Sequence, residues 1–290
     1  MHDTAYKTGQ IFFELYWKSD FHNIVDFGAG DVNGSLRDHC PKGAEYTGLD
    51  ITAGPGVDVC IRPHEPLPLC DEFADVVVTS SVFEHDELFW ETFLELVRIT
   101  RKGGFLYINA PSNGNYHRYP VDCWRFYPDA GAALARWARS KGLEVELVES
   151  CIIRRASDVW NDFVAVFHRQ GAEPLGPQAL LSDRLPCLNI KRGEEEAIHG
   201  LQGETEDMTL LGAQQQELRA QAARISTLEH ELSGERATLA LTKAELAAER
   251  AELASARAEL ATLRLSTSWK VTAPLRTART YLLHLTGRSF

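Results

Sequence analysis

The sequence predicts an α/β protein with a doubly wound, mostly parallel sheet, followed by a long coiled-coil helix. Strand-like and helix-like runs alternate over residues 1–170, which is the pattern of such a sheet. From position 211 to position 260, leucine or isoleucine recurs at every seventh residue. We therefore expect a globular domain over residues 1–170, a linker over 171–205, a coiled coil over 206–265 and a basic tail over 266–290. The linker could hold a short ordered piece around ALLSDRLPCL, residues 179–188.

The globular domain contains seven runs with the length and composition of strands. They are NIVDF (23–27), YTGLDI (46–51), VDVCI (57–61), ADVVVTS (74–80), GFLYINA (104–110), LEVELVES (143–150) and DFVAVFHR (162–169). The segments VVV and FLYI lack polar alternation, as strands covered on both faces do. Residues 85–102 and 129–142 have the apolar spacing of helices, and glycines end both of them.

The composition excludes several classes of protein. The net charge of −11 argues against a general nucleic-acid binder. None of the six cysteines stands in a CxxC pair, so we expect neither a zinc site nor a disulfide framework, and a reducing cytoplasm suits them. The first ten residues lack the basic start and apolar run of a signal peptide, and no run of about 18 apolar residues predicts a membrane span.

The leucine repeat allows two heptad registers. With the leucines at position d, position a holds five basic residues, from Arg236 to Arg264, which is a charged core. With the leucines at position a, Glu231 faces Arg236 of a parallel partner, and four further pairs of opposite charge share that offset. We therefore predict a parallel, in-register homodimer. In this register position d, the second column of the predicted interface, holds few large apolar residues. The alternative is a charged helix that does not pair.

The tail mixes apolar and basic residues. They are Trp269, Leu275, Tyr281, Leu282 and Leu285 with Lys270, Arg276, Arg279 and Arg288. The phrase SWKVTAPLR resembles a short C-terminal element of bacterial proteins that synthesise cell-surface polysaccharides. Such a tail could dock on an anionic membrane surface or an acidic partner, and the alternative is a frayed basic end.

The stretch NIVDFGAGDVNG, residues 23–34, runs from a strand directly into a loop of small residues. Gly28, Ala29 and Gly30 carry no bulky side chain, so the backbone N–H groups of this loop can approach a ligand closely. The next strand ends at Asp50, about 20 positions after the glycines, where a carboxylate can accept hydrogen bonds from ribose hydroxyls. The alternatives are a tight turn without a ligand and a solvated carboxylate.

The segment VDFGAG, followed by YTGLDI, ADVVVTSSVFEH and RKGGFLYINAP, resembles the class I S-adenosylmethionine-dependent methyltransferases of the type 11/12 group. The resemblance covers about residues 20–170. It implies a Rossmann-like sheet of seven strands whose last strand, here DFVAVFHR, is antiparallel, and it implies S-adenosyl-L-methionine as the cofactor. Two features depart from the family: the loop is not GxGxG, and Ile61-Arg62 stands where an acid usually approaches the adenine amine.

The resemblance also implies which residues meet the cofactor. Gly28, Ala29 and Gly30 would lie against its methionine and ribose parts, with Asp26 beneath the loop. The further contacts that it implies are Asp50 to the ribose, Ile51 and Ile61 near the adenine, and Ser80 and Ser81 closing the pocket. Glu84 and His85 follow the fourth strand, where they could supply a base or position the methionine end of the cofactor; the alternative role is capping of the following helix.

The acceptor site is predicted in the aromatic segment NGNYHRYPVDCWRFYP, residues 113–128, which resembles an H-x-x-P-x-D-x-W-R-[FY] signature of a methyltransferase subgroup. His117 is the candidate general base, because an unperturbed imidazole has a pKa near about 6.5. Asp122 could orient His117 or serve in its place. Arg125 could hold an anionic substrate group or pair with Asp122.

In the same segment, Tyr119 and Trp124 offer flat faces to a sugar or ring. The alternative is a structural lid in which these residues only cover the sheet. A metal site of His117, Asp122 and Glu84 follows no ligand spacing rule, so no metal is predicted.

Together these features predict a cytoplasmic S-adenosylmethionine-dependent methyltransferase that O-methylates a saccharide or surface-polysaccharide precursor. The coiled coil would make it a homodimer. Two other functions remain open: a small-molecule methyltransferase of secondary metabolism, and a non-catalytic methyltransferase-like scaffold whose helix organises partners.

Overall fold

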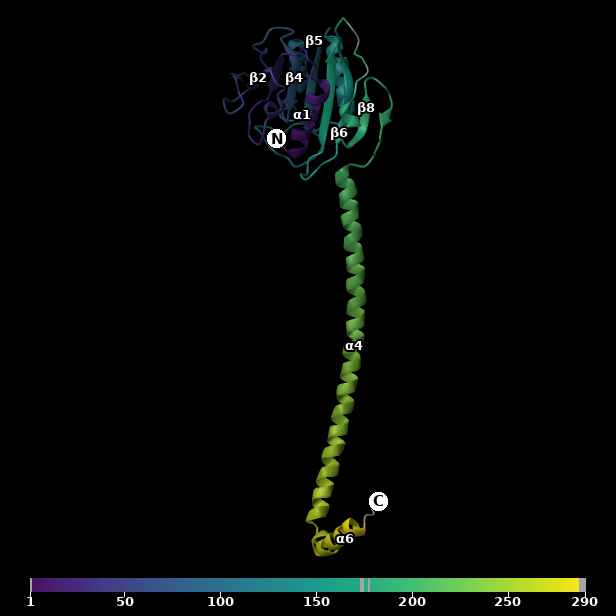
Figure 1. The fold of residues 1–290 in the computed structure, drawn as a ribbon. Helices are drawn as coiled ribbons and strands as arrows, with labels where there is room; N and C mark the ends of the chain where they lie inside the picture. The colour runs from purple at the N-terminus through teal and green to yellow at the C-terminus, as the bar shows by residue number, and fades with distance from the viewer. Residues whose placement is uncertain (1, 173–174, 177, 287–290) are drawn as a thin grey trace. The chain divides into compact units, whose positions relative to one another are not determined.

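The computed structural model describes residues 2–172, 175–176 and 178–286. The chain forms two compact units, Met1–Thr209 and Leu210–Phe290. The first unit holds the sheet and the helices packed on it, and the second holds most of one long helix and the helices after it (Figure 1).

The first unit is built on one mixed sheet of nine strands, in the order β3-β2-β1-β4-β5-β7-β6-β8-β9. The strands are β1 (Asn23–Phe27), β2 (Glu45–Asp50), β3 (Val59–Cys60), β4 (Ala74–Ser80), β5 (Thr100–Pro111), β6 (Val145–Ile153), β7 (Asp162–Arg169), β8 (Cys187–Arg192) and β9 (Ile198–His199). The first five strands are parallel, and β7 runs antiparallel between β5 and β6. The Rossmann-like α/β fold is therefore confirmed, with two more strands than the seven expected.

The two additional strands lie within residues 171–205, where we expected a linker. Strand β8 pairs antiparallel with β6, and β9 pairs with β8. Leu181 and Leu188 are buried there, and the Leu181 amide donates a 2.6 Å hydrogen bond to the buried carboxylate of Glu149. The hydroxyl of Tyr16 donates to the same carboxylate at 2.7 Å. Few large apolar residues occur in this segment, but the ones present complete the sheet.

Helices cover both faces of the sheet. They are α1 (Asp3–Tyr16), α2 (Phe89–Ile99) and α3 (Asp129–Ser140), with short 3₁₀ helices at Leu36–His39 and Leu181–Asp183. Along β4, Val77 packs with residues of α2 and α3, whereas Val76 and Val78 pack with residues of α1. Burial on both faces explains why these strands show no polar alternation. The sequence reading had not anticipated α1.

Helix α2 ends earlier than the glycine pair at 103 and 104 suggested. Its last residue is Ile99, and β5 begins at the next residue. The guanidinium of Arg169 donates hydrogen bonds to the carbonyls of Val97 (3.0 Å) and Arg98 (2.7 Å), and to that of Thr100. These bonds satisfy carbonyls that have no partner inside the helix, so the helix can end there.

The first turn of helix α4 (Glu206–Leu265) is attached to loops of the first unit. The side-chain amide of Asn161 donates to Glu206 at 2.6 Å, and that of Asn113 donates to Asp207 at 2.6 Å. Arg155 forms ion pairs with both acidic residues. Two acidic residues at a helix N-terminus also interact favourably with the helix dipole.

The second unit contains the rest of α4 and two further helices among its described residues. The long helix expected over 206–265 is confirmed as α4, and α5 (Thr267–Val271) and α6 (Ala273–Thr286) follow it. The structure describes every residue of α4, and none of them is buried; Leu232 and Leu239 of the heptad column are 47% and 54% exposed. Pairing of this helix therefore stays a prediction. Within the described residues, no helix has the length and apolar character that crossing a membrane requires.

Candidate active site

The glycine loop follows β1 at the carboxyl edge of the parallel strands. The amides of Gly28 and Ala29 both donate to the carbonyl of Leu49, at 2.8 and 3.0 Å, and the amide of Gly30 donates to Oδ2 of Asp50 at 3.0 Å. We had expected these N–H groups to face a ligand. They instead tie the loop to the neighbouring strand β2. The side chain of Val82 also packs against the loop, since a Cβ atom at Gly28 would lie 2.1 Å from it.

Glycine is required here because backbone segments lie very close together. A Cβ atom at Gly48 would lie 2.1 Å from the carbonyl oxygen of Gly56, and a Cβ atom at Gly30 would lie 3.0 Å from the Asp50 carboxylate. The Asp50 side chain therefore faces the glycine loop. Beside it, Ile51 is 49% exposed, which leaves an apolar surface next to the carboxylate.

A buried polar network lies beneath the loop. Asp26 is 4% exposed and accepts a 2.8 Å hydrogen bond from the Tyr46 hydroxyl. Burial raises the pKa of Asp26 to about 7. The guanidinium of Arg37 lies 4.7 Å from the centre of the Tyr46 ring and pairs with Asp58, which also accepts from the Gly48 amide at 2.7 Å. Sequence reasoning found Asp26 but missed Tyr46, Arg37 and Asp58, because their contacts join segments that only the folded sheet brings together.

Other polar residues gather where β4 and β5 end and where β7 begins. The hydroxyl of Ser80 is buried and has no hydrogen-bond partner in the described part of the chain. Ser81 adopts a positive φ of 57°, and its amide donates to the Asn109 carbonyl at 3.0 Å. The apolar residue Ile61 lies elsewhere on this edge, directly after β3. It packs against the core, and its amide donates to the Asp50 carbonyl at 2.9 Å.

Asp162 is a residue of this edge that the sequence reading missed. It is fully buried, and burial raises its pKa, while Nε2 of His2 lies 3.1 Å from its Oδ1. The antiparallel direction of β7 places the start of this strand at the edge where the parallel strands end. The position of Asp162 at the first residue of the predicted last strand was the available signal.

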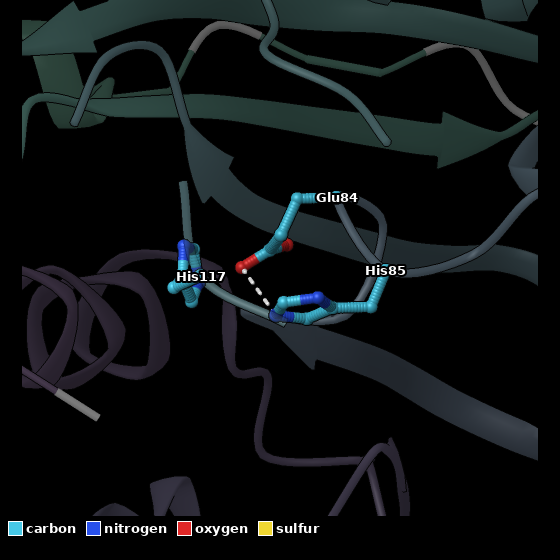
Figure 2. A group of neighbouring side chains, drawn as sticks. All are labelled: Glu84, His85 and His117. Atoms are coloured by element: carbon cyan, nitrogen blue, oxygen red, sulfur yellow. Dashed lines mark ion pairs between the residues drawn. The ribbon is translucent and has the colours of Figure 1, made fainter. Parts of the chain in front are cut away.

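Glu84, His85 and His117 form a compact group (Figure 2). Glu84 is 1% exposed, and its Oε1 lies 3.6 Å from Nε2 of His85. Burial raises the pKa of Glu84 to about 8, and burial lowers the pKa of His85. The rings of His85 and His117 lie 4.9 Å apart, edge to face. Two predicted segments thus meet, since Glu84 follows β4 and His117 follows β5.

The backbone also joins these two segments. The amides of Cys123 and Trp124 donate to the carbonyl of Glu84, at 2.7 and 3.2 Å. The indole N–H of Trp124 donates to the Asp86 carbonyl at 2.9 Å, and its ring packs edge-on against Phe89. The aromatic segment 113–128 is therefore held against the turn after β4.

Asp122 and Arg125 form the internal frame of this segment. Arg125 donates to both carboxylate oxygens of Asp122, at 2.6 and 3.0 Å, and these bonds lower the pKa of Asp122 to about 2. Arg125 also donates to the carbonyls of Asn113, Asn115 and Trp124. Of the two roles considered for Arg125, pairing with Asp122 is therefore the one found.

Asp122 contacts His117 twice. Its Oδ2 accepts the backbone amide of His117 at 2.7 Å and lies 3.5 Å from Nδ1 of the ring. This arrangement fits an orienting role for Asp122. Tyr119 is 71% exposed, with its ring 6.4 Å from that of His85, so it offers a free face beside the group. Trp124 is 37% exposed and combines packing with a partly open face.

Comparison with known proteins gives a family for the sheet region. Residues 25–108 match the family model described as "Methyltransferase domain". This part of the chain is a methyltransferase domain. The class I S-adenosylmethionine-dependent family expected from the sequence, with S-adenosyl-L-methionine as its cofactor, is thereby confirmed. No curated protein matches the chain.

Several solved structures are similar to the methyltransferase domain. A putative methyltransferase in complex with the Haloferax volcanii Trm112 activator is 17% identical, with a TM-score of 0.44, covering 59% of this chain and 92% of that one. The Burkholderia thailandensis 1,6-didemethyltoxoflavin-N1-methyltransferase is 15% identical, with a TM-score of 0.46, covering 57% and 77%. A methyltransferase from Aquifex aeolicus is 12% identical, with a TM-score of 0.39, covering 56% and 89%.

The residues at the edge of the methyltransferase domain fit the cofactor. Asp50 retains acceptor capacity for hydroxyl groups, because its oxygens otherwise meet only the amides of Gly30 and Thr52 among the described residues. The buried hydroxyl of Ser80 lacks a partner that a ligand would supply. Glycine at position 30 allows the Asp50 carboxylate to lie against the loop, because a Cβ atom there would come within 3.0 Å of that carboxylate.

Proposed function

We propose that this chain transfers the methyl group of S-adenosylmethionine to a hydroxyl group of a saccharide or surface-polysaccharide precursor. The observation that carries the proposal is the backbone attachment of the aromatic segment 113–128 to Glu84. This attachment holds His117 and the exposed ring of Tyr119 beside the sheet edge that carries the cofactor-binding candidates.

We assign the cofactor to the residues along the carboxyl edge. The carboxylate of Asp50 would accept hydrogen bonds from the ribose hydroxyls, and the exposed side chain of Ile51 would cover the adenine. Gly28, Ala29 and Gly30 would allow close approach of the methionine and ribose parts. The loop itself is held by hydrogen bonds of its amides to the Leu49 carbonyl and the Asp50 carboxylate.

The chemistry follows from the donor. S-adenosylmethionine supplies a methyl group on a sulfonium, and an in-line displacement forms the bond from the acceptor oxygen to carbon as the bond from sulfur to carbon breaks. The protein has to align the acceptor and to accept its proton. The group of Glu84, His85 and His117 is our choice for the second task, with Asp122 holding His117 in position.

The shape and polarity of two aromatic side chains support a saccharide acceptor. Tyr119 and Trp124 present flat faces of the type on which sugar rings stack. The tail motif that resembles polysaccharide-synthesis proteins supports the same acceptor class. We further propose that two copies of the chain pair through α4. The pair would work in the cytoplasm. Its basic tail would dock on an anionic membrane surface or an acidic partner.

Calorimetry and turnover test the proposal together. We expect S-adenosylmethionine to bind one site per chain, and methyl transfer from labelled cofactor to appear with saccharide acceptors. His117→Ala should retain cofactor affinity and lose methyl transfer by a factor of about 100 or more. Cofactor binding without transfer to any saccharide would contradict the acceptor class, and failure to bind the cofactor would overturn the enzymatic function.

A further inference from the structure

The group of Glu84, His85 and His117 has the composition of a metal site. Each residue offers one ligand atom, and the three atoms lie within 4.8 Å of one another. Two imidazole nitrogens and one carboxylate oxygen suit divalent transition-metal ions such as Zn²⁺, Mn²⁺, Fe²⁺ and Co²⁺. The sequence reading had considered His117, Asp122 and Glu84 as ligands and had predicted no metal. In the structure Asp122 is paired with Arg125, and the third residue of the group is His85.

The distance between the ligand atoms of Glu84 and His85 suits one shared ion. Bonds of about 2.1 Å in tetrahedral geometry put neighbouring ligand atoms about 3.4 Å apart. Oε1 of Glu84 and Nε2 of His85 lie 3.6 Å apart. His117 has the most exposed side chain of the three, at 38%, so its ring is the one with space to adjust.

The carboxylate of Glu84 is short of partners. Its side chain is 1% exposed, and Oε2 has no hydrogen-bond partner among the residues described. A buried polar atom without a partner is costly, and a bound cation would remove that cost. This carboxylate faces the two imidazole rings (Figure 2).

Both histidines are oriented as metal ligands usually are. Nδ1 of His85 lies 2.5 Å from the carbonyl oxygen of Val121, which can only accept, so Nδ1 carries the proton and Nε2 keeps a lone pair. Nδ1 of His117 lies 3.2 Å from the Asn115 carbonyl and 3.5 Å from the Asp122 carboxylate, which also only accept. A histidine ligand typically donates its other ring N–H to a carbonyl or carboxylate in this way.

We propose that Glu84, His85 and His117 bind one divalent transition-metal ion at the edge of the sheet. Three protein ligands leave coordination positions open, as in catalytic rather than structural sites. The catalytic role of the ion rests on the proposed function, which it extends. An acceptor hydroxyl bound to the ion would lose its proton to solvent more readily. In this refinement of the proposed function, His117 holds the ion, and the group promotes loss of the acceptor's proton through the ion in place of accepting that proton directly.

Metal binding to the full chain tests the site independently of methyl transfer. After dialysis against a chelator, we expect Co²⁺ to bind one equivalent per chain, with visible absorption bands, and Zn²⁺ to displace it. Glu84→Gln and His117→Ala should each weaken Co²⁺ binding at least about tenfold, since changes even to outer-shell partners cost about 10–100-fold. His199→Ala, in an exposed pair with Glu195 remote in sequence from the group, is the matched control and should bind Co²⁺ normally.

The outcomes separate the two proposals. If the variants keep their melting temperature and still bind Co²⁺ as the parent does, or if the parent takes up no stoichiometric ion, the site is overturned. Calorimetry of S-adenosylmethionine with His117→Ala, which should retain cofactor affinity, reports whether the fold and the cofactor site are intact. Stoichiometric Co²⁺ binding without any methyl transfer would leave the metal site standing and contradict the proposed function.

Discussion

At the scale of single residues, contacts around Gly48 determine whether the cofactor edge can form. Gly48→Ala would place its Cβ atom 2.1 Å from the backbone oxygen of Gly56, so the loop has to move. We expect this variant to lose about 1–3 kcal/mol of unfolding free energy and to bind S-adenosylmethionine at least about tenfold more weakly, a factor worth about 1.4 kcal/mol. Urea unfolding and calorimetry measure the two effects.

Gly54→Ala is the matched control for that change. Gly54 precedes the same turn, and no heavy atom of the described residues comes within 4 Å of a Cβ atom built there. This variant should unfold and bind like the parent. Equal behaviour of the two alanine variants would show that the close approach of Gly48 and Gly56 is not needed for the cofactor site.

The buried carboxyl of Asp26 predicts a pH-dependent stability. Its pKa is about 7 in the folded protein, against 3.8 as the ordinary value. The folded state therefore holds a proton that the unfolded state has lost, so this group makes the protein less stable as the pH rises from about 4 to about 7. The loss is at most about 4 kcal/mol, from about 1.4 kcal/mol for each pKa unit.

Asp26→Asn removes that titration. We expect the unfolding free energy of the variant, relative to the parent, to increase between pH 5 and pH 8 in urea titrations. Asp20→Asn, at a side chain that is 70% exposed, should show the parent's pH trend. A parallel pH trend in the parent and in Asp26→Asn would contradict the raised pKa.

At the scale of elements, β8 and β9 complete the first unit. A chain that ends at residue 170 loses the buried side chain of Leu181 and the amide that donates to Glu149. A chain that ends at residue 209 keeps both. We expect the shorter chain to be less stable by at least about 3 kcal/mol in urea unfolding, from a lost leucine side chain and an unsatisfied buried carboxylate. Equal midpoints for the two chains would mean that this segment acts only as a linker.

The elements that the sequence predicted well are those with a local signal. The apolar runs of β1, β4 and β5 and the spacing of α2 and α3 are visible within a few residues. Strand β8 carries Lys191 and Arg192, so its apolar pattern is weak, and it is stabilised by pairing with β6. Its assignment needed a partner strand about 40 residues earlier in the chain, which no local pattern reveals.

The residues of the candidate site also differ in whether a local sequence signal predicts them. Gly28, Gly30 and Asp50 were found because they follow strand ends, where a known spacing predicts a ligand. Asp162 and Arg37 were missed because their partners lie in distant segments. The group of Glu84 and His117 could be suspected only as two separate clusters, since the distance between them depends on the course of segment 113–128.

At the scale of the whole molecule, the exposed leucine column predicts the oligomeric state. Leu239 lies in the heptad column, whereas Leu241 lies two residues away, off the predicted seam; they are 54% and 68% exposed. Leu239→Lys should shift the intact chain from dimer to monomer in sedimentation equilibrium, because a charge would enter the apolar seam. Leu241→Lys should remain dimeric. A parent chain that sediments as a monomer would contradict the coiled coil.

The saturated guanidinium of Arg125 has a consequence for which acceptors the enzyme accepts. All of its N–H vectors are directed to Asp122 and to three peptide carbonyls of its own segment. A phosphate or uronate that arrived here would find this cation already neutralised, and would gain no attraction from it. Under the proposed function, the choice of acceptor beside Arg125 would then depend on stacking and shape, which favours uncharged rings over acidic ones.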